Sequence, residues 1–151
     1  MTKRSGMGFI LVGVVMLSTA AAAITADQIV VDRKNACQMS VPADWKASSI
    51  LKGSASSPDK MDSVIMSSTS QGQSLNDAKT VMQGIYKPVK VLEDSAQRFW
   101  YEYVVPNNQN GKTRAWYVGI PVKGNVCGAQ ITMKDGNEAA AKNIAMSLKA
   151  K

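Results

Sequence analysis

The sequence predicts an α+β fold, an antiparallel β-sheet covered by helices on both faces as an α/β/α sandwich. Residues 98–105, 113–122 and 126–134 are rich in β-branched and aromatic residues and are separated by short turn clusters, which predicts a three-stranded meander. Apolar residues recur at helical spacing after Ser74 and again over residues 138–149. The order strands, helix, strands, helix favours a sheet with helices packed on it.

Shorter strands are predicted before and after the first helix. Residues 37–41, 47–51 and 62–68 have strand-like patterns, and residues 89–93 form a short strand before the meander. Between them, residues 53–60 (GSASSPDK) are typical of a loop. Residues 27–36 form a lead without an assigned strand.

Each predicted helix has a defined buried face. Ser74 and Asp77 have the spacing of a capping box at the start of the first helix, and Pro88 prevents its continuation. The buried face of that helix is expected to comprise Leu75, Ala78, Val81, Met82 and Ile85. In the second helix it is expected to comprise Ala141, Ile144, Ala145 and Leu148.

Residues 1–26 have the pattern of a secretory signal peptide. Lys3 and Arg4 precede an apolar run over residues 9–17, and small residues follow, so cleavage is expected after Ala23 or Ala26. An uncleaved anchor is the alternative, but the apolar run is shorter than the ~20 residues that a spanning helix needs. We therefore expect one mature domain, residues 27–151, that is periplasmic or secreted and not stably inserted in a membrane.

The mature chain is moderately basic. Loss of Lys3 and Arg4 leaves 18 − 2 = 16 basic residues against 11 acidic ones, a net charge of 16 − 11 = +5. Such a charge favours acidic partners or anionic polymers of the envelope, although many solvated domains have a similar balance.

Cys37 and Cys127 are the two cysteines of the chain. In an exported protein such a pair is expected to form one disulfide. It would close a loop of 127 − 37 = 90 residues, for which the chain-entropy model gives roughly 4–5 kcal/mol of stabilisation. The alternative, two free thiols that bind a metal or act as nucleophiles, lacks a C-x-x-C motif and nitrogen partners.

Histidine is absent from the chain. This removes the commonest general base, the Ser-His and Cys-His pairs, and the histidine ligands of catalytic zinc. Asp59 with Asp62 and Glu93 with Asp94 are the best carboxylate clusters, and both are expected to be solvated surface. Asp59 and Asp62 could bind a hard cation but lack the ligand spacing of a calcium loop, and Glu93 and Asp94 alternate across a strand and cannot converge on one atom. We therefore expect no cofactor, no metal and no catalytic residue.

Aromatic residues and arginines on the predicted meander are the main candidates for binding a partner. They are Arg98, Trp100, Tyr101, Tyr103, Arg114, Trp116 and Tyr117. An exposed surface of these rings would suit a protein interface, because Trp and Tyr dominate binding hot spots. The alternative is that one face packs under the helices and loops partly shield the other.

The polar segment at residues 106–112 supplies two further candidates, Asn108 and Asn110. Most such segments are only turns, and Asn110 with Gly111 suits a tight hairpin. Basic residues interleaved with aromatics also occur on single-stranded nucleic-acid platforms. Export, and the lack of the Gly-aromatic signature of an RNA-recognition motif, argue against nucleic acid.

The chain resembles the Mog/PsbP-like fold group, which includes the extrinsic photosystem protein PsbP and bacterial envelope proteins of the DcrB type. The matching features are an opening strand that ends in a Pro-x-x-Trp turn at residues 42–45, the Ser57-Pro58 loop and the strand after it, the helix start at Ser74-Leu75, the three-strand run through residues 126–134 and a closing helix that ends at residues 147–149. The resemblance covers nearly all of the mature chain. It implies an accessory or binding protein without shared catalytic residues.

These observations favour an exported, non-enzymatic binding or accessory protein of the bacterial envelope that acts through a protein interface. A narrower hypothesis is an immunity protein that blocks a toxin in the same compartment. A periplasmic carrier of a small molecule or ion is the alternative from another class, since a pocket can lie between the layers of a sandwich. An enzyme is the third option.

Overall fold

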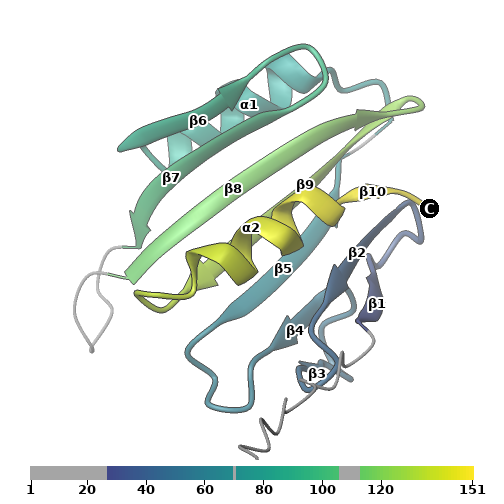
Figure 1. The fold of residues 1–151 in the computed structure, drawn as a ribbon. Coiled ribbons are helices and arrows are strands. Elements are labelled where there is room, and N and C mark those ends of the chain that lie inside the picture. Colours follow the sequence, from purple (N-terminus) through teal and green to yellow (C-terminus); the bar gives the residue numbers. More distant parts are fainter. Residues whose placement is uncertain (1–26, 70, 106–112) are drawn as a thin grey trace, which may run out of the picture.

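The computed structural model describes residues 27–69, 71–105 and 113–151, which form two antiparallel sheets (Figure 1). The larger sheet comprises β3 (Lys46–Ala47), β4 (Ser54–Ser56), β5 (Ser63–Ser68), β6 (Lys90–Asp94), β7 (Phe99–Val105), β8 (Thr113–Val122) and β9 (Asn125–Met133), in the order β3-β4-β5-β9-β8-β7-β6. The smaller sheet comprises β1 (Gln28–Val31), β2 (Cys37–Val41) and β10 (Lys149–Ala150), in the order β1-β2-β10. The expected leader, residues 1–26, and the expected turn at residues 106–112 lie outside the described residues.

Two helices lie on opposite faces of the larger sheet. Helix α1 (Leu75–Ile85) covers the face that carries Phe99 and Tyr101, whereas α2 (Glu138–Ser147) covers the face that carries Trp100 and Trp116. The smaller sheet packs beside α2 on that second face, and Figure 1 shows α1 behind the sheet and α2 in front of it. The predicted α+β fold with helices on both faces is confirmed. In the described part of the chain, neither helix combines the length and apolar character needed to cross a membrane.

The start of α1 is the predicted capping box. Ser74 Oγ accepts a hydrogen bond from the N–H of Asp77 at 3.1 Å, and the Asp77 carboxylate accepts one from the N–H of Ser74 at 3.2 Å. The predicted buried face is only partly correct, because Val81 and Ile85 are 52% and 61% exposed. The Tyr86 ring packs against Tyr103, with ring centroids 4.5 Å apart. The face of α1 that packs on the sheet therefore comprises residues 75, 78 and 82, followed by Tyr86.

The strand predicted at residues 47–51 is wrong, and the loop predicted at residues 53–60 is wrong over residues 54–56, which form β4. The chain leaves β3 at Ala47, turns, and re-enters the sheet as β4 within the expected loop. Ser48 explains the turn, because its Oγ accepts hydrogen bonds from the N–H groups of Ile50 and Leu51 at 3.2 and 2.9 Å. A serine that bonds nearby backbone amides competes with strand pairing.

The smaller sheet contains two strands that the sequence analysis missed. β1 lies in the segment that was expected to be a lead, and it pairs with β2 from Gln28↔Val41 to Val31↔Gln38. The second helix ends at Ser147 rather than residue 149, because Leu148 is already extended and Lys149 pairs with Gln38 of β2. Its predicted buried face is confirmed, since Ala141, Ile144, Ala145 and Leu148 are all buried.

Two paired glycines allow aromatic rings to lie against the sheet on the α1 face. Gly119 of β8 lies opposite both Phe99 of β7 and Gly128 of β9. A Cβ added at Gly119 would lie 2.4 Å from the Phe99 ring, and one added at Gly128 would lie 2.1 Å from the hydroxyl of Tyr117. The close approach of these rings therefore requires glycine at both positions.

Substitution of either glycine is expected to destabilise the protein. Gly119→Ala and Gly128→Ala should each lower the free energy of unfolding by about 1–3 kcal/mol, because a buried ring must move to admit the methyl group. Urea denaturation measures the effect. Gly84→Ala is the matched control, since that glycine lies in α1 with no atom within 4 Å of the added Cβ. The control should be about 1 kcal/mol more stable than the wild type, and a loss in all three variants would contradict the explanation.

Candidate functional site

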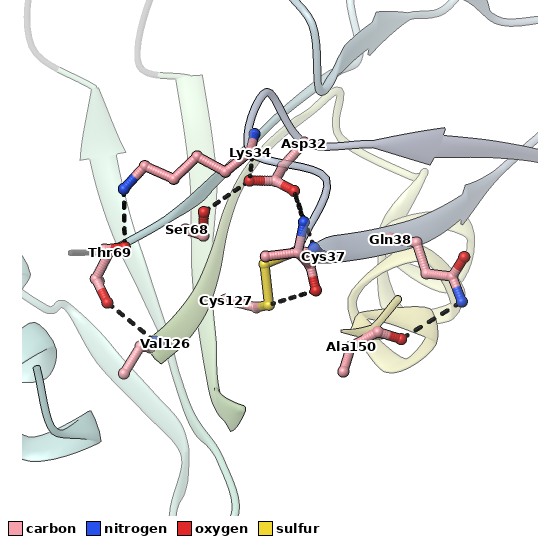
Figure 2. Close-up of a disulfide and its surroundings, with 10 residues drawn as sticks. Asp32, Lys34, Cys37, Gln38, Ser68, Thr69, Val126, Cys127 and Ala150 are labelled. Atoms are coloured by element: carbon pink, nitrogen blue, oxygen red, sulfur yellow. Dashed lines mark hydrogen bonds between the residues drawn. A yellow bond between two sulfur atoms is a disulfide. The ribbon is translucent and has the colours of Figure 1, made fainter. Parts of the chain in front are cut away.

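A buried disulfide joins the two sheets. Cys37 begins β2 in the smaller sheet and Cys127 lies in β9 of the larger one, and the structure pairs them with their Cα atoms 5.7 Å apart. Both residues are fully buried. Figure 2 shows the bond between their sulfur atoms. The predicted pairing is confirmed. Because no strand of one sheet pairs with a strand of the other, this bond is a covalent link between two layers of the same core.

The carboxylate of Asp32 holds the β1–β2 turn beside the disulfide, and the sequence analysis missed this residue. It accepts hydrogen bonds from the N–H groups of Lys34, Ala36 and Cys37 at 3.2, 2.7 and 2.9 Å, and from Ser68 Oγ at 2.7 Å (Figure 2). The bond to Ser68 ties this turn to β5 of the larger sheet. An aspartate at the start of a polar turn often accepts hydrogen bonds from the backbone N–H groups that follow it, so the sequence alone could have indicated this role of Asp32.

Hydrogen bonding controls the ionisation of Asp32. Burial of the carboxylate raises the pKa, but the hydrogen bonds from Cys37, Ser68, Ala36 and Lys34 together outweigh burial and leave the pKa below its usual value of 3.8. The group is therefore ionised at neutral pH while it is only 4% exposed. Four donors surround one buried negative charge, which makes the turn a rigid support for the disulfide.

The five aromatic candidates are buried, as the packing interpretation of the sequence predicts, and they form no exposed aromatic surface. The exposed fractions are 1% for Tyr101, 3% for Tyr103, 4% for Tyr117 and 6% for both Trp100 and Trp116. The tyrosines pack under α1, and the two tryptophans form an edge-to-face pair on the other face. Burial follows from the coverage of both faces of the sheet. Their role in binding a partner stays a prediction, and any such role would act through the core.

The tyrosine hydroxyl groups stay protonated. Burial raises the pKa of Tyr101 and of Tyr103, and it raises the pKa of Tyr117 to about 12. A phenol with so high a pKa does not act as a base at neutral pH. The arrangement of these rings therefore indicates packing.

Arg114 brings several side chains together at the end of the sheet near the start of α2. Its guanidinium donates to both oxygens of Glu102, at 3.2 and 2.8 Å, and to Glu138 at 2.5 Å. Trp116 Nε1 donates to the same Glu102 carboxylate at 3.1 Å. The hydrogen bond from Arg114 is the largest cause that lowers the pKa of Glu102. These carboxylates neutralise the arginine and orient it for packing between β7, β8 and α2.

Arg98 lies at the other end of β7 and contacts the second helix. Its guanidinium donates to Met146 Sδ at 3.2 Å and lies 3.6 Å from the carboxylate of Glu93. The structure therefore does not bring Arg98 and Arg114 together. Asn108 and Asn110, the remaining candidates, lie outside the described residues.

The carboxylate pairs have different surroundings. Asp62 was expected to be solvated but is buried, because its oxygens accept hydrogen bonds from the Lys134 N–H and the Asn137 side chain, both at 2.5 Å. Asp59 accepts hydrogen bonds from Ser57 Oγ and the Met61 N–H. Glu93 and Asp94 form surface ion pairs with Arg98 and Lys79. Across residues 27–69, 71–105 and 113–151, no three potential ligands among His, Cys, Asp and Glu come together.

An apolar hollow lies at the β3–β4 edge of the larger sheet. It has a volume of about 440 Å³ and is lined in part by Ile50, Leu51 and Ile65, with Lys46 and Lys60 beside them. We call it the Ile50 hollow, because Ile50 is 95% exposed and is the most exposed large apolar residue of the described chain. The hollow was not predicted from the sequence, because residues 47–51 were expected to form a strand. In a strand the side chains alternate between two faces, so part of this segment would have been buried.

Comparison with known proteins gives a match at the level of structure. No family model and no curated protein matches the sequence. The solution structure of cyanobacterial PsbP (CyanoP) from Synechocystis sp. PCC 6803 is similar, with a TM-score of 0.54 and 15% identity over 90% of this chain and 99% of that chain. The fold is PsbP-like.

Two further structures are similar to this PsbP-like fold. A structure from Bacteroides thetaiotaomicron VPI-5482 has a TM-score of 0.53 and 11% identity over 76% of this chain, and the match spans 45% of that chain. LpqN, described as involved in cell envelope biogenesis of Mycobacterium tuberculosis, has a TM-score of 0.49 and 13% identity over 83% of this chain and 91% of its own. At 15% and 11% identity, the similarity to the cyanobacterial and the Bacteroides structures establishes the fold and no more.

Substitution of Asp32 is expected to destabilise the PsbP-like fold in a pH-dependent way. Because the folded pKa is lowered, the carboxylate stabilises the fold above its unfolded pKa of about 3.9, and this stabilisation is lost as the pH falls through the folded pKa. Asp32→Asn should therefore lower the free energy of unfolding by about 1–3 kcal/mol at pH 7. The difference from the wild type should narrow below about pH 4.

Urea denaturation between pH 7 and pH 3 measures both effects. Asp44→Asn, at an exposed position, is the control and should match the wild type throughout. An Asp32→Asn protein as stable as the wild type at pH 7 would show that the turn does not depend on the buried charge.

Proposed function

We propose that this protein is a non-enzymatic accessory protein of the bacterial envelope, located in the periplasm or secreted, which acts by binding another protein. The observation that carries the proposal is the buried Cys37–Cys127 disulfide between the two sheets. Disulfides form and persist in oxidising compartments and are rare in the cytosol. The signal-like residues 1–26 support the same location. The absence of histidine from the sequence supports a binding role over catalysis.

The Ile50 hollow is the surface we assign to the protein partner. Ile50, Leu51 and Ile65 are 95%, 50% and 43% exposed, and exposed apolar groups rimmed by polar residues mark interaction sites. Lys46 and Lys60 lie at the same hollow and favour a partner with acidic groups around an apolar centre. This surface replaces the aromatic residues as the main contact, because the rings are buried.

The arginines and asparagines named from the sequence are secondary contacts in this proposal. The side chain of Arg114 is 34% exposed and that of Arg98 is 18% exposed, so both side chains are partly accessible, although Nε of Arg98 is buried. Asn108 and Asn110 belong to the segment between β7 and β8, whose paired ends, Val105 and Thr113, adjoin Arg114. In the narrower role, immunity, the protein that binds these surfaces would be a toxin in the same compartment.

A small-molecule carrier receives less support from the packing. The space between α2 and the larger sheet has a volume of about 10 Å³, room for about one water molecule. The hollows of about 340, 410 and 440 Å³ are open surface grooves rather than enclosed cavities. A carrier that encloses its ligand between α2 and the larger sheet would therefore have no space for it.

Site-specific photo-crosslinking in intact cells tests the proposal. A photoreactive amino acid at Ile50 should give an adduct with one protein species of the envelope, and a second change, Leu51→Ser, should reduce the yield several-fold. The same group at Lys142, an exposed position on α2, is the matched control and should give no such adduct.

The identity of the adduct decides between the general and the narrower role. A toxin encoded beside the gene would support immunity, and another envelope protein would support an accessory role. An absence of adducts from Ile50, Asn110 and Arg114 alike would overturn the proposed protein interface.

A further inference from the structure

One end of the molecule gathers five exposed basic residues from three separate parts of the chain. They are Arg33 and Lys34 in the β1–β2 turn, Lys123 in the β8–β9 turn, and Lys149 and Lys151 at and after β10. We call this set the basic end. Figure 1 shows the two turns and the C-terminal strand on the same side of the molecule. The sequence shows the excess of basic residues but does not show whether they lie together on the surface.

Contacts between backbone segments hold the basic end together. Lys34 Nζ donates to the Thr69 carbonyl at 2.9 Å, and the Val126 N–H of β9 donates to Thr69 Oγ1 at 3.0 Å (Figure 2). The Lys151 N–H donates to the Ala36 carbonyl at 3.0 Å, while Lys149 pairs with Gln38 in β2. The disulfide lies beneath these contacts. The five cations are therefore presented by a rigid base.

The basic end accounts for the whole net charge of the mature domain. Without its five residues, the 16 basic residues of the mature chain fall to 11, which equals the number of acidic residues. Within the described residues, none of the five forms an ion pair with a carboxylate. Asp32 is the acidic residue nearest to them in the chain, and its charge is buried under four hydrogen bonds.

The geometry points to an anionic lipid surface as the partner of the basic end. Five cations on separate projecting segments match a broad array of phosphate headgroups, and each such residue near an anionic bilayer strengthens binding about fivefold. The described residues of these segments include no large exposed apolar side chain, whereas protein hot spots are built on buried aromatic or apolar anchors. This contact is separate from the Ile50 hollow and goes beyond the proposed protein interface.

Vesicle co-sedimentation tests this inference with protein purified after expression of the full 151-residue chain. Vesicles of equal parts phosphatidylglycerol and phosphatidylcholine should bind the protein at low salt, and pure phosphatidylcholine vesicles should not. High salt should release the protein, because it screens exposed charges. The triple variant Arg33→Gln, Lys123→Gln, Lys149→Gln should bind about 100-fold more weakly, at about fivefold per charge.

A second triple variant separates position from net charge. Lys87→Gln, Lys134→Gln, Lys142→Gln removes the same charge from exposed residues outside both the basic end and the Ile50 hollow, and this variant should bind nearly as well as the wild type. Equal losses in the two triple variants, equal binding to neutral vesicles, or no binding to anionic vesicles would each overturn the inference. Because the vesicles contain no protein, these results do not test the proposed protein interface, which the crosslinking experiment tests separately.

Discussion

The link between the two sheets is the constraint on which the rest of the structure depends. The smaller sheet shares no hydrogen-bonded strand with the larger one, so side-chain packing and the Cys37–Cys127 disulfide hold it in place. Asp32 reinforces the link, because its buried carboxylate binds the backbone of the turn on one side and Ser68 of β5 on the other. Covalent linkage over 90 residues restricts the unfolded chain and thereby favours the folded state.

This link also determines what the surface offers. Because helices and the smaller sheet cover both faces of the larger sheet, the aromatic residues are buried in the core, and the two surfaces proposed for binding lie at the edges and ends of that sheet. One edge presents the Ile50 hollow, and one end presents the basic residues of the β1–β2 turn and β10. The second surface exists only when the smaller sheet is docked, since Lys149 and Lys151 are positioned by pairing with β2 and Ala36. A disulfide that stabilises the fold thus also assembles a surface.

Most of the fold could be predicted from the sequence where one physical signal dominated. The meander, the capping box at Ser74 and the buried stripe of α2 follow from alternation, capping and helical spacing, and all three are confirmed. Predictions failed where tertiary contacts decided the outcome. β1 and β10 are short strands that form by pairing with β2, which lies far from β10 in the sequence. The hydroxyl of Ser48 accepts hydrogen bonds from nearby backbone N–H groups, so a turn forms where a strand was predicted. The candidate site was harder to predict from the sequence. Whether Trp100 is buried or Ile50 is exposed depends on which faces of the larger sheet are covered, and the local sequence pattern does not determine this.

The most direct test of the account is the oxidation state of the two cysteines in the protein as cells produce it. Cells are lysed in the presence of an alkylating agent, and the intact mass of the purified protein is measured before and after reduction. The account predicts no alkylated thiol in the unreduced protein and two after reduction, together with the loss of residues up to Ala23 or Ala26. Two alkylated thiols in the unreduced protein would contradict both the covalent link between the sheets and the oxidising compartment inferred from it.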